Sequence, residues 1–112
     1  MKVEEFVRYI ADADVNALIG EDRHDEFHRF LDERFAEGKD KVVFRFLFER
    51  ENTDDIPTPY YVWVVYPIVD HDSFYETSGI AEMIPPDFDD PSSYLKVPDE
   101  LRGEAYFEAF VP

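Results

Sequence analysis

Two apolar runs in the middle of the sequence constrain the fold of this chain most strongly. In residues 42–48 every even position holds a large apolar side chain, and this alternation predicts a strand with one buried face. Residues 60–69 are apolar on both faces, which is typical of a central strand that is covered above and below. Residues 52–59 contain two acids and two prolines and predict a loop. The middle of the chain therefore predicts two strands of one sheet.

The residues before these strands repeat with a helical period instead. Residues 3–11 predict an amphipathic helix and residues 21–37 a second, longer one, with a short turn over residues 14–19 between them. Gly20 and Gly38 stand where the turn and the second helix are expected to end, because glycine is favoured just beyond helix C-termini. The apolar stripe of the second helix comprises Phe27, Phe30, Leu31 and Phe35.

Residues 70–98 admit two interpretations. Ser73 and Glu76 are spaced as in a capping box, which predicts a short helix. The alternative is a third strand that ends at Ile84, where two prolines follow. The remaining stretch predicts an irregular loop that exposes Phe88 among acidic residues.

Residues 104–111 alternate in polarity and predict a closing strand. Helices followed by strands are typical of the α+β class. We therefore expect two N-terminal helices packed on a small antiparallel sheet of three to four strands. The length of 112 residues predicts a single compact domain over residues 1–112.

The chain has no cysteine, which excludes a disulfide scaffold, a thiol nucleophile and cysteine-based metal sites. Two glutamates stand in the N-terminal MKVEEFVRYI, where a signal peptide needs an apolar run, and no stretch approaches ~18 apolar residues. The sequence therefore predicts a soluble, cytoplasmic protein.

The net charge of −16 is unevenly distributed along the chain. Between Arg50 and Lys96 lie 45 residues without a lysine or arginine, and we call this the base-free stretch. Its carboxylates cannot be neutralised by neighbours in sequence, which predicts a field of one sign. Such a field disfavours nucleic acid and anionic membranes as direct ligands. The carboxylates are those of Glu51, Asp54, Asp55, Asp70, Asp72, Glu76, Glu82, Asp87, Asp89 and Asp90.

The pair His24 and His28 is the strongest catalytic candidate. At a spacing of four residues on a helix the two imidazoles lie on one face, where they can share a metal ion. The spacing resembles the metalloprotease pattern H-E-x-x-H, but Asp25 replaces the glutamate, and only His71 or a carboxylate is left as third ligand. Histidines beside an apolar stripe are more often boundary residues. We therefore expect no metal, no cofactor and no enzyme, with a small metal-dependent hydrolase as a lesser alternative.

Aromatic side chains of the second strand, at Tyr60, Tyr61, Trp63 and Tyr66, are open to two interpretations. Aromatic residues on a sheet stack bases in many RNA-binding proteins, but those surfaces also carry lysine and arginine. Because this strand lies in the base-free stretch, core packing is the better interpretation.

In size and composition the chain resembles small phage-borne inhibitors, namely DNA-mimic anti-restriction proteins and anti-CRISPR proteins. It also resembles acidic immunity proteins that neutralise toxic nucleases. The resemblance implies an inhibitor that binds the basic nucleic-acid-binding surface of a CRISPR effector or nuclease, with an immunity protein as the alternative. Charge places the expected partner-binding residues in the base-free stretch, on the ten carboxylates named above, with Phe88 as an apolar anchor.

Overall fold

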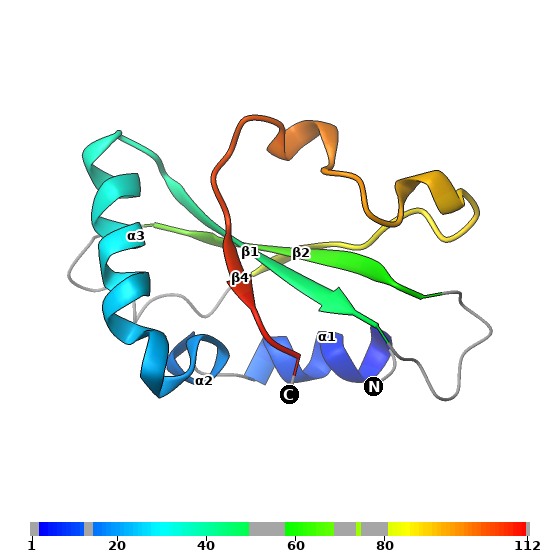
Figure 1. Cartoon of the computed structure of the whole chain (residues 1–112), viewed down its shortest axis with the longest axis horizontal. Coiled ribbons are helices and arrows are strands. Elements are labelled where there is room, and N and C mark those ends of the chain that lie inside the picture. The colour runs from blue at the N-terminus through cyan, green and yellow to red at the C-terminus, as the bar shows by residue number, and fades with distance from the viewer. Residues whose placement is uncertain (1–2, 13–14, 50–57, 69–73, 75–80, 112) are drawn as a thin grey trace.

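The computed structural model of the chain describes residues 3–12, 15–49, 58–68, 74 and 81–111. Within these residues, strands form a sheet in the order β3-β2-β1-β4, and the helices precede it in sequence, which confirms the α+β class (Figure 1). The strands are β1 Lys41–Phe48, β2 Tyr60–Pro67, β3 Glu82–Ile84 and β4 Phe107–Ala109. The helices are α1 Val3–Asp12, α2 Val15–Ile19 and α3 His24–Ala36, with the 3₁₀ turns η1 Glu21–Arg23, η2 Pro91–Ser93 and η3 Asp99–Leu101.

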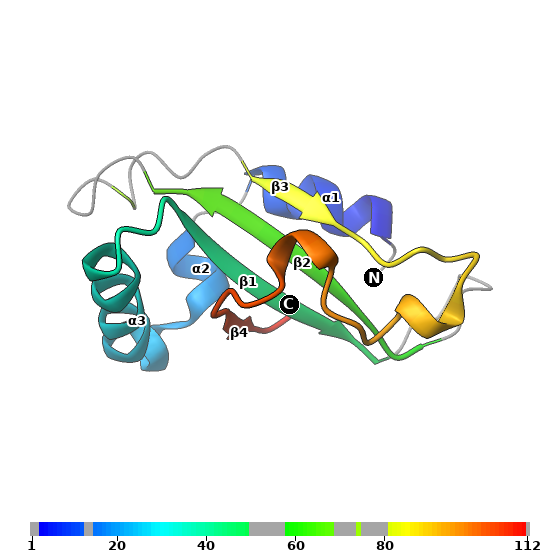
Figure 2. The ribbon, with the colours of Figure 1, turned by 90° about the horizontal axis from the view of Figure 1, so that it is seen from above.

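The sheet is mixed, so the expectation of an antiparallel sheet is corrected. β2 pairs antiparallel with both β1 and β3, whereas β4 pairs parallel with β1, with Phe44 opposite Phe107. β3 and β4 lie at opposite edges and run in the same direction, so the chain must cross the sheet between them. Residues 85–106 make this crossing (Figure 2). The predicted strand over residues 104–111 is shorter than expected, because only residues 107–109 pair with β1.

The interpretation of a third strand that ends at Ile84 is confirmed by β3. The other interpretation, a capping box of Ser73 and Glu76, falls on residues outside the described part of the chain. Within that part, none of the helices combines the length and the apolar character that crossing a bilayer requires.

One face of the sheet, which we call the helix face, carries the main core. The even positions of β1, predicted to be buried, are buried, and Phe48 stacks on Tyr60 of β2 with ring centroids 5.1 Å apart. α1 and α2 lie beneath this face and α3 flanks one end of it (Figure 1). The helices contribute the buried side chains of Phe6, Ile10, Val15, Leu18, Ile19, Phe27 and Leu31 to this core.

The opposite face, which we call the loop face, is covered by the crossing segment, residues 85–106 (Figures 1 and 2). A smaller cluster of Val43, Trp63 and Leu101 is buried there. β2 is therefore an interior strand with cover on both sides, as its apolar sequence predicts.

The second predicted helix begins as the turn η1 and becomes α-helical at His24. It ends as predicted at Gly38, whose φ of 74° is left-handed, and the amide of Lys39 donates to the carbonyl of Arg34 at 3.0 Å. Its apolar stripe is narrower than predicted. Phe35 is 49% exposed and lies one turn beyond Leu31, whereas Phe27 and Leu31 are the buried residues of the helix.

Candidate interaction surface

A row of side chains crosses the loop face at one level. Strand register places Glu108 of β4 opposite Arg45 of β1, Arg45 opposite Trp63 of β2, and Trp63 opposite Ile84 of β3. Directly opposed residues project to the same face of a sheet. The row therefore runs from a charged pair at one edge to apolar side chains at the other.

Arg45 anchors the charged end of the row. Its guanidinium is ion-paired with Glu108 and donates a hydrogen bond of 2.8 Å to the hydroxyl of Tyr106. The guanidinium carbon also lies 4.2 Å from the ring centroid of Tyr61 and 4.4 Å from that of Tyr106. These contacts fasten the end of the crossing segment to the middle of the sheet through cation–π and charge-assisted interactions.

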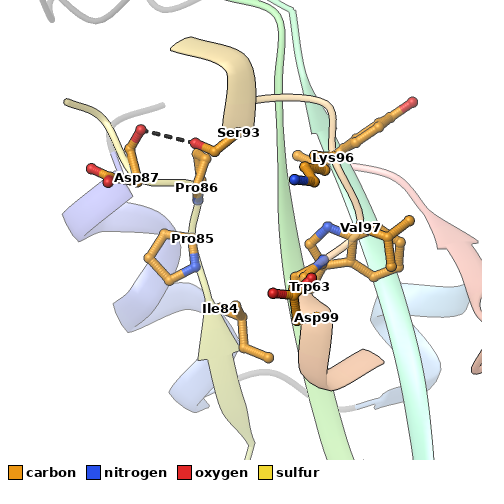
Figure 3. A pocket seen from close by; sticks show the side chains of 11 residues that line it. Trp63, Ile84, Pro85, Pro86, Asp87, Ser93, Lys96, Val97 and Asp99 are labelled. Carbon is orange, nitrogen blue, oxygen red and sulfur yellow. Dashed lines mark hydrogen bonds between the residues drawn. The ribbon is translucent and has the colours of Figure 1, made fainter. Parts of the chain in front are cut away.

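The apolar end of the row opens into a groove of about 220 Å³ between the sheet and the crossing segment. Ile84, Pro85 and Pro86 lie along one side, and Val97 and Trp63 along the other (Figure 3). Tyr61, Asp87, Ser93, Lys96, Pro98 and Asp99 complete the lining.

Trp63 is the one tryptophan of the chain, and its side chain is nearly fully buried in the wall of this groove. Within the described part of the chain, its buried indole N–H has no hydrogen-bond acceptor. A buried donor left without an acceptor costs about 1–3 kcal/mol.

Three predicted site residues, Asp87, Asp89 and Asp90, form one exposed turn beside the groove, which we call the acidic turn. The Asp87 carboxylate accepts a hydrogen bond of 3.0 Å from the amide of Asp89, and the Asp87 carbonyl accepts one from the amide of Asp90. The Ser93 hydroxyl donates to the carbonyls of Asp87 and Asp90 at 2.9 and 2.7 Å. The turn is thus held by its own hydrogen bonds.

Asp90 caps η2, which begins one residue later. Its carboxylate accepts hydrogen bonds from the hydroxyl of Ser92 at 2.7 Å and from the amide of Ser92 at 3.1 Å. These bonds, the hydroxyl first, hold the pKa of Asp90 below its usual value, and the charge of Lys96 lowers it further. The local hydrogen bonds therefore favour the ionised form of Asp90.

Phe88 lies between these acids but is half-buried rather than exposed. Its ring centroid lies 5.3 Å from that of Tyr60 and 6.0 Å from that of Tyr94, and its carbonyl accepts a hydrogen bond from the Tyr94 hydroxyl. The ring thus joins the edge of the main core. It fixes the acidic turn to the sheet, a role that the sequence analysis did not predict.

The remaining site predictions divide into two groups. Glu82 is exposed at the start of β3, on the edge strand of the sheet. The other predicted carboxylates fall on residues outside the described part of the chain, so the structure does not place them relative to the acidic turn. They are Glu51, Asp54, Asp55, Asp70, Asp72 and Glu76.

Charge is distributed asymmetrically over the described residues. Every described carboxylate except Glu104 and Glu108 belongs to an exposed residue. Among the ion pairs of the described residues, none includes a carboxylate of the acidic turn. The lysine and arginine side chains that form ion pairs with carboxylates are those of Arg23, Arg34, Lys39, Lys41, Arg45 and Arg102.

The two candidate metal ligands lie on α3 as predicted. His28 is exposed, and its Nδ1 lies 3.2 Å from Oδ2 of Asp32 one turn later. Among the described residues, no group of three or more histidine, aspartate or glutamate side chains is arranged to hold a metal ion. His71, the predicted third ligand, lies outside those residues.

Comparison of the chain with protein-family models, with curated proteins and with solved structures finds no match.

Proposed function

We propose that this protein is a small acidic inhibitor that binds the basic nucleic-acid-binding surface of another protein, such as a CRISPR effector or a nuclease, and blocks access of DNA or RNA. The observation that carries the proposal is the charge asymmetry. Basic side chains are largely engaged in ion pairs within the fold, whereas nearly all described carboxylates are exposed.

Such a surface can replace a nucleic acid on a basic partner. Duplex DNA carries one charge per ~1.7 Å of helix axis, and its binding proteins present a complementary groove of lysine and arginine. An acidic protein that enters this groove is steered there by long-range attraction. Its negative charge also repels free nucleic acid, so the inhibitor does not bind the DNA or RNA that it displaces.

The acidic turn supports this role through its order. The carboxylates of Asp87 and Asp90 accept hydrogen bonds within residues 87–93, and Phe88 attaches the turn to the sheet. Groups that are already ordered lose less conformational entropy on binding.

Displacement of nucleic acid tests the proposal. The full chain is added to purified guide-RNA-loaded CRISPR effectors and to purified nucleases, each bound to fluorescent duplex DNA. We expect release of the DNA from at least one partner, with less release as salt rises, and no gel shift of DNA by the protein alone. Tight binding of DNA by the protein itself, or no release from any partner, would overturn the proposal.

Matched charge variants locate the surface. D87N/D89N/D90N removes three charges from the acidic turn, whereas the control D25N/D32N/E33Q removes three from α3, where basic residues are interspersed. We expect the first variant to slow association with the partner more than the second. Charge changes at Asp54/Asp55 and at Asp70/Asp72 test the other predicted clusters in the same assay.

A further inference from the structure

The groove on the loop face has the size of one long side chain. Its volume of about 220 Å³ lies below the ~300–1,000 Å³ typical of cofactor and drug-sized sites. Proline, valine and isoleucine side chains form much of its walls and suit an aliphatic stem (Figure 3).

The charges around the groove favour a cation. The carboxylates of Asp87 and Asp99 belong to its lining, and the rest of the acidic turn lies beside it, against the single ammonium of Lys96. The Asp99 carboxylate already accepts a hydrogen bond from the Arg102 guanidinium, with Oδ1 and Nη2 2.6 Å apart. A carboxylate at this rim can therefore bind a guanidinium in solvent.

The aromatic side chains favour arginine over lysine. On this same face the guanidinium carbon of Arg45 lies 4.2 Å from the ring centroid of Tyr61. A guanidinium is planar and less strongly hydrated than an ammonium, so it stacks on aromatic rings at a smaller desolvation cost. Tyr61 also lines the groove.

We propose that the groove between β2, β3 and the crossing segment receives an arginine side chain of the basic partner. This inference rests on the proposed function, because it names the group of that partner that enters the acidic face. The acidic turn attracts the partner, and the groove selects arginine.

The emission of Trp63 provides the test, because the chain has no other tryptophan. The full chain is titrated at low salt with acetyl-Gly-Arg-Gly-amide and with acetyl-Gly-Lys-Gly-amide, which carry the same charge, and N-acetyltryptophanamide serves as the background control. We expect a saturable change in emission with the arginine peptide at a concentration several-fold lower than with the lysine peptide. Equal responses, or no saturable response, would overturn the inference.

Two substitutions fix the sign of the occupant's charge. Lys96→Gln removes the competing cation and should tighten arginine binding about two- to five-fold, whereas Asp87→Asn should weaken it by a similar factor. Asp87→Asn keeps an oxygen that can accept from the Asp89 amide, so the turn is preserved. Weaker binding by Lys96→Gln would mean that the groove holds an anion and would overturn the inference.

The inference and the proposed function can fail separately. Tyr61→Leu removes the tyrosine ring from the groove lining and leaves Trp63 and the charge of the acidic turn unchanged. If this variant and the wild type displace DNA from the partner equally well, the groove inference is wrong while the inhibitor proposal stands. If the arginine peptide binds but no partner releases DNA, the inhibitor proposal fails while the groove retains its preference for arginine.

Discussion

The two faces of the sheet are built from the same strands but are covered in different ways. On the helix face, three helices bury a continuous aromatic and aliphatic cluster against β1 and β2. On the loop face, the crossing segment buries a cluster of only Val43, Trp63 and Leu101. The groove, the ion pair of Arg45 with Glu108 and exposed carboxylates also lie on this side. Apolar burial supplies most of the stability of a domain. We infer that the helix face stabilises the fold and that the loop face is available for binding.

The largest expected effect is the loss of core packing on the helix face. Phe44 is fully buried, with the rings of Phe27, Tyr66 and Phe107 between 5.5 and 6.2 Å from its own. Phe44→Ala should lower the free energy of unfolding by about 3–5 kcal/mol. Leu101→Ala on the loop face should lower it by about 2 kcal/mol, because Leu101 belongs to a much smaller buried cluster. Urea unfolding measures both values.

The emission of Trp63 distinguishes the two faces further. Leu101→Ala uncovers the indole and should shift its emission to longer wavelength in the folded state, whereas Phe44→Ala should not. A larger loss of stability from Leu101→Ala than from Phe44→Ala would contradict the division of roles between the faces.

A smaller effect is expected from salt. The net charge of −16 repels itself, and this repulsion is screened over ~10 Å at 0.1 M salt. The melting temperature should therefore rise by several degrees with monovalent salt and level off below molar concentration. A gain of about 1 kcal/mol in the free energy of unfolding raises the melting temperature of a domain of this size by ~4–8 °C. Calorimetry in sodium chloride measures the rise.

The same measurement on the charge variants compares the two regions. D87N/D89N/D90N should flatten the salt dependence more than D25N/D32N/E33Q, because the acids of α3 lie among basic side chains. A flat response of the wild type would show that the carboxylates are already neutralised within the fold.

Sequence periodicity predicted those elements whose own residues carry the signal. The alternation in β1 and the apolar run of β2 were sufficient to predict both strands. Each strand is long, and its apolar positions lie within one short stretch of sequence. The parallel pairing of Phe44 with Phe107 was not predicted, since it joins positions far apart in sequence. The cover of the loop face was not predicted for the same reason, because Leu101 and Trp63, which are buried together there, also lie far apart in sequence.

The candidate site was predicted in part for related reasons. The missing lysines and arginines indicated an acidic surface, and Asp87, Asp89 and Asp90 are exposed. The half-burial of Phe88 depends on Tyr60, which lies 28 positions earlier, and no local pattern encodes that contact. The groove likewise depends on how the crossing segment lies on the sheet.

Two tyrosines of the main core, one in β2 and one in the crossing segment, give opposite expectations. The Tyr66 hydroxyl on the helix face is buried with no hydrogen-bond partner among the described residues, so Tyr66→Phe should be neutral or stabilising by up to ~1 kcal/mol. The Tyr94 hydroxyl donates to the Phe88 carbonyl, so Tyr94→Phe should cost about 0.5–1.5 kcal/mol. Thermal unfolding at pH 7 measures both, and a clear loss of stability in Tyr66→Phe would contradict the burial of an unpaired hydroxyl.

Alkaline pH tests Tyr66 a second time. Burial, and to a lesser extent Tyr9, raise the pKa of Tyr66 to about 12 from its usual value of 10.0. The folded state therefore keeps this proton where the unfolded chain has lost it. The resulting stability is fully present below pH 10 and is lost as the pH rises through 12. Tyr66→Phe should make the decline of stability over this range shallower.

The smallest effect is expected at Asp90, where the folded state holds an exposed carboxylate by local hydrogen bonds alone. Because the Ser92 hydroxyl and amide lower the pKa of Asp90, its contribution is present above the ordinary carboxyl pKa and is lost as the pH falls through the lower folded value. Asp90→Ala should speed hydrogen exchange of the Ser92 amide at pH 7, and Asp90→Asn, which keeps an acceptor, should speed it less. After correction for intrinsic exchange, the difference between the wild type and Asp90→Ala should shrink as the pH falls through the folded pKa. Since Phe88 and Tyr94 attach the turn to the core independently of this carboxylate, the melting temperature of both variants should stay close to that of the wild type. A large drop in melting temperature would mean that the Asp90 carboxylate, and not only Phe88 and Tyr94, holds the turn on the core, and the expectation of a local effect would then be wrong.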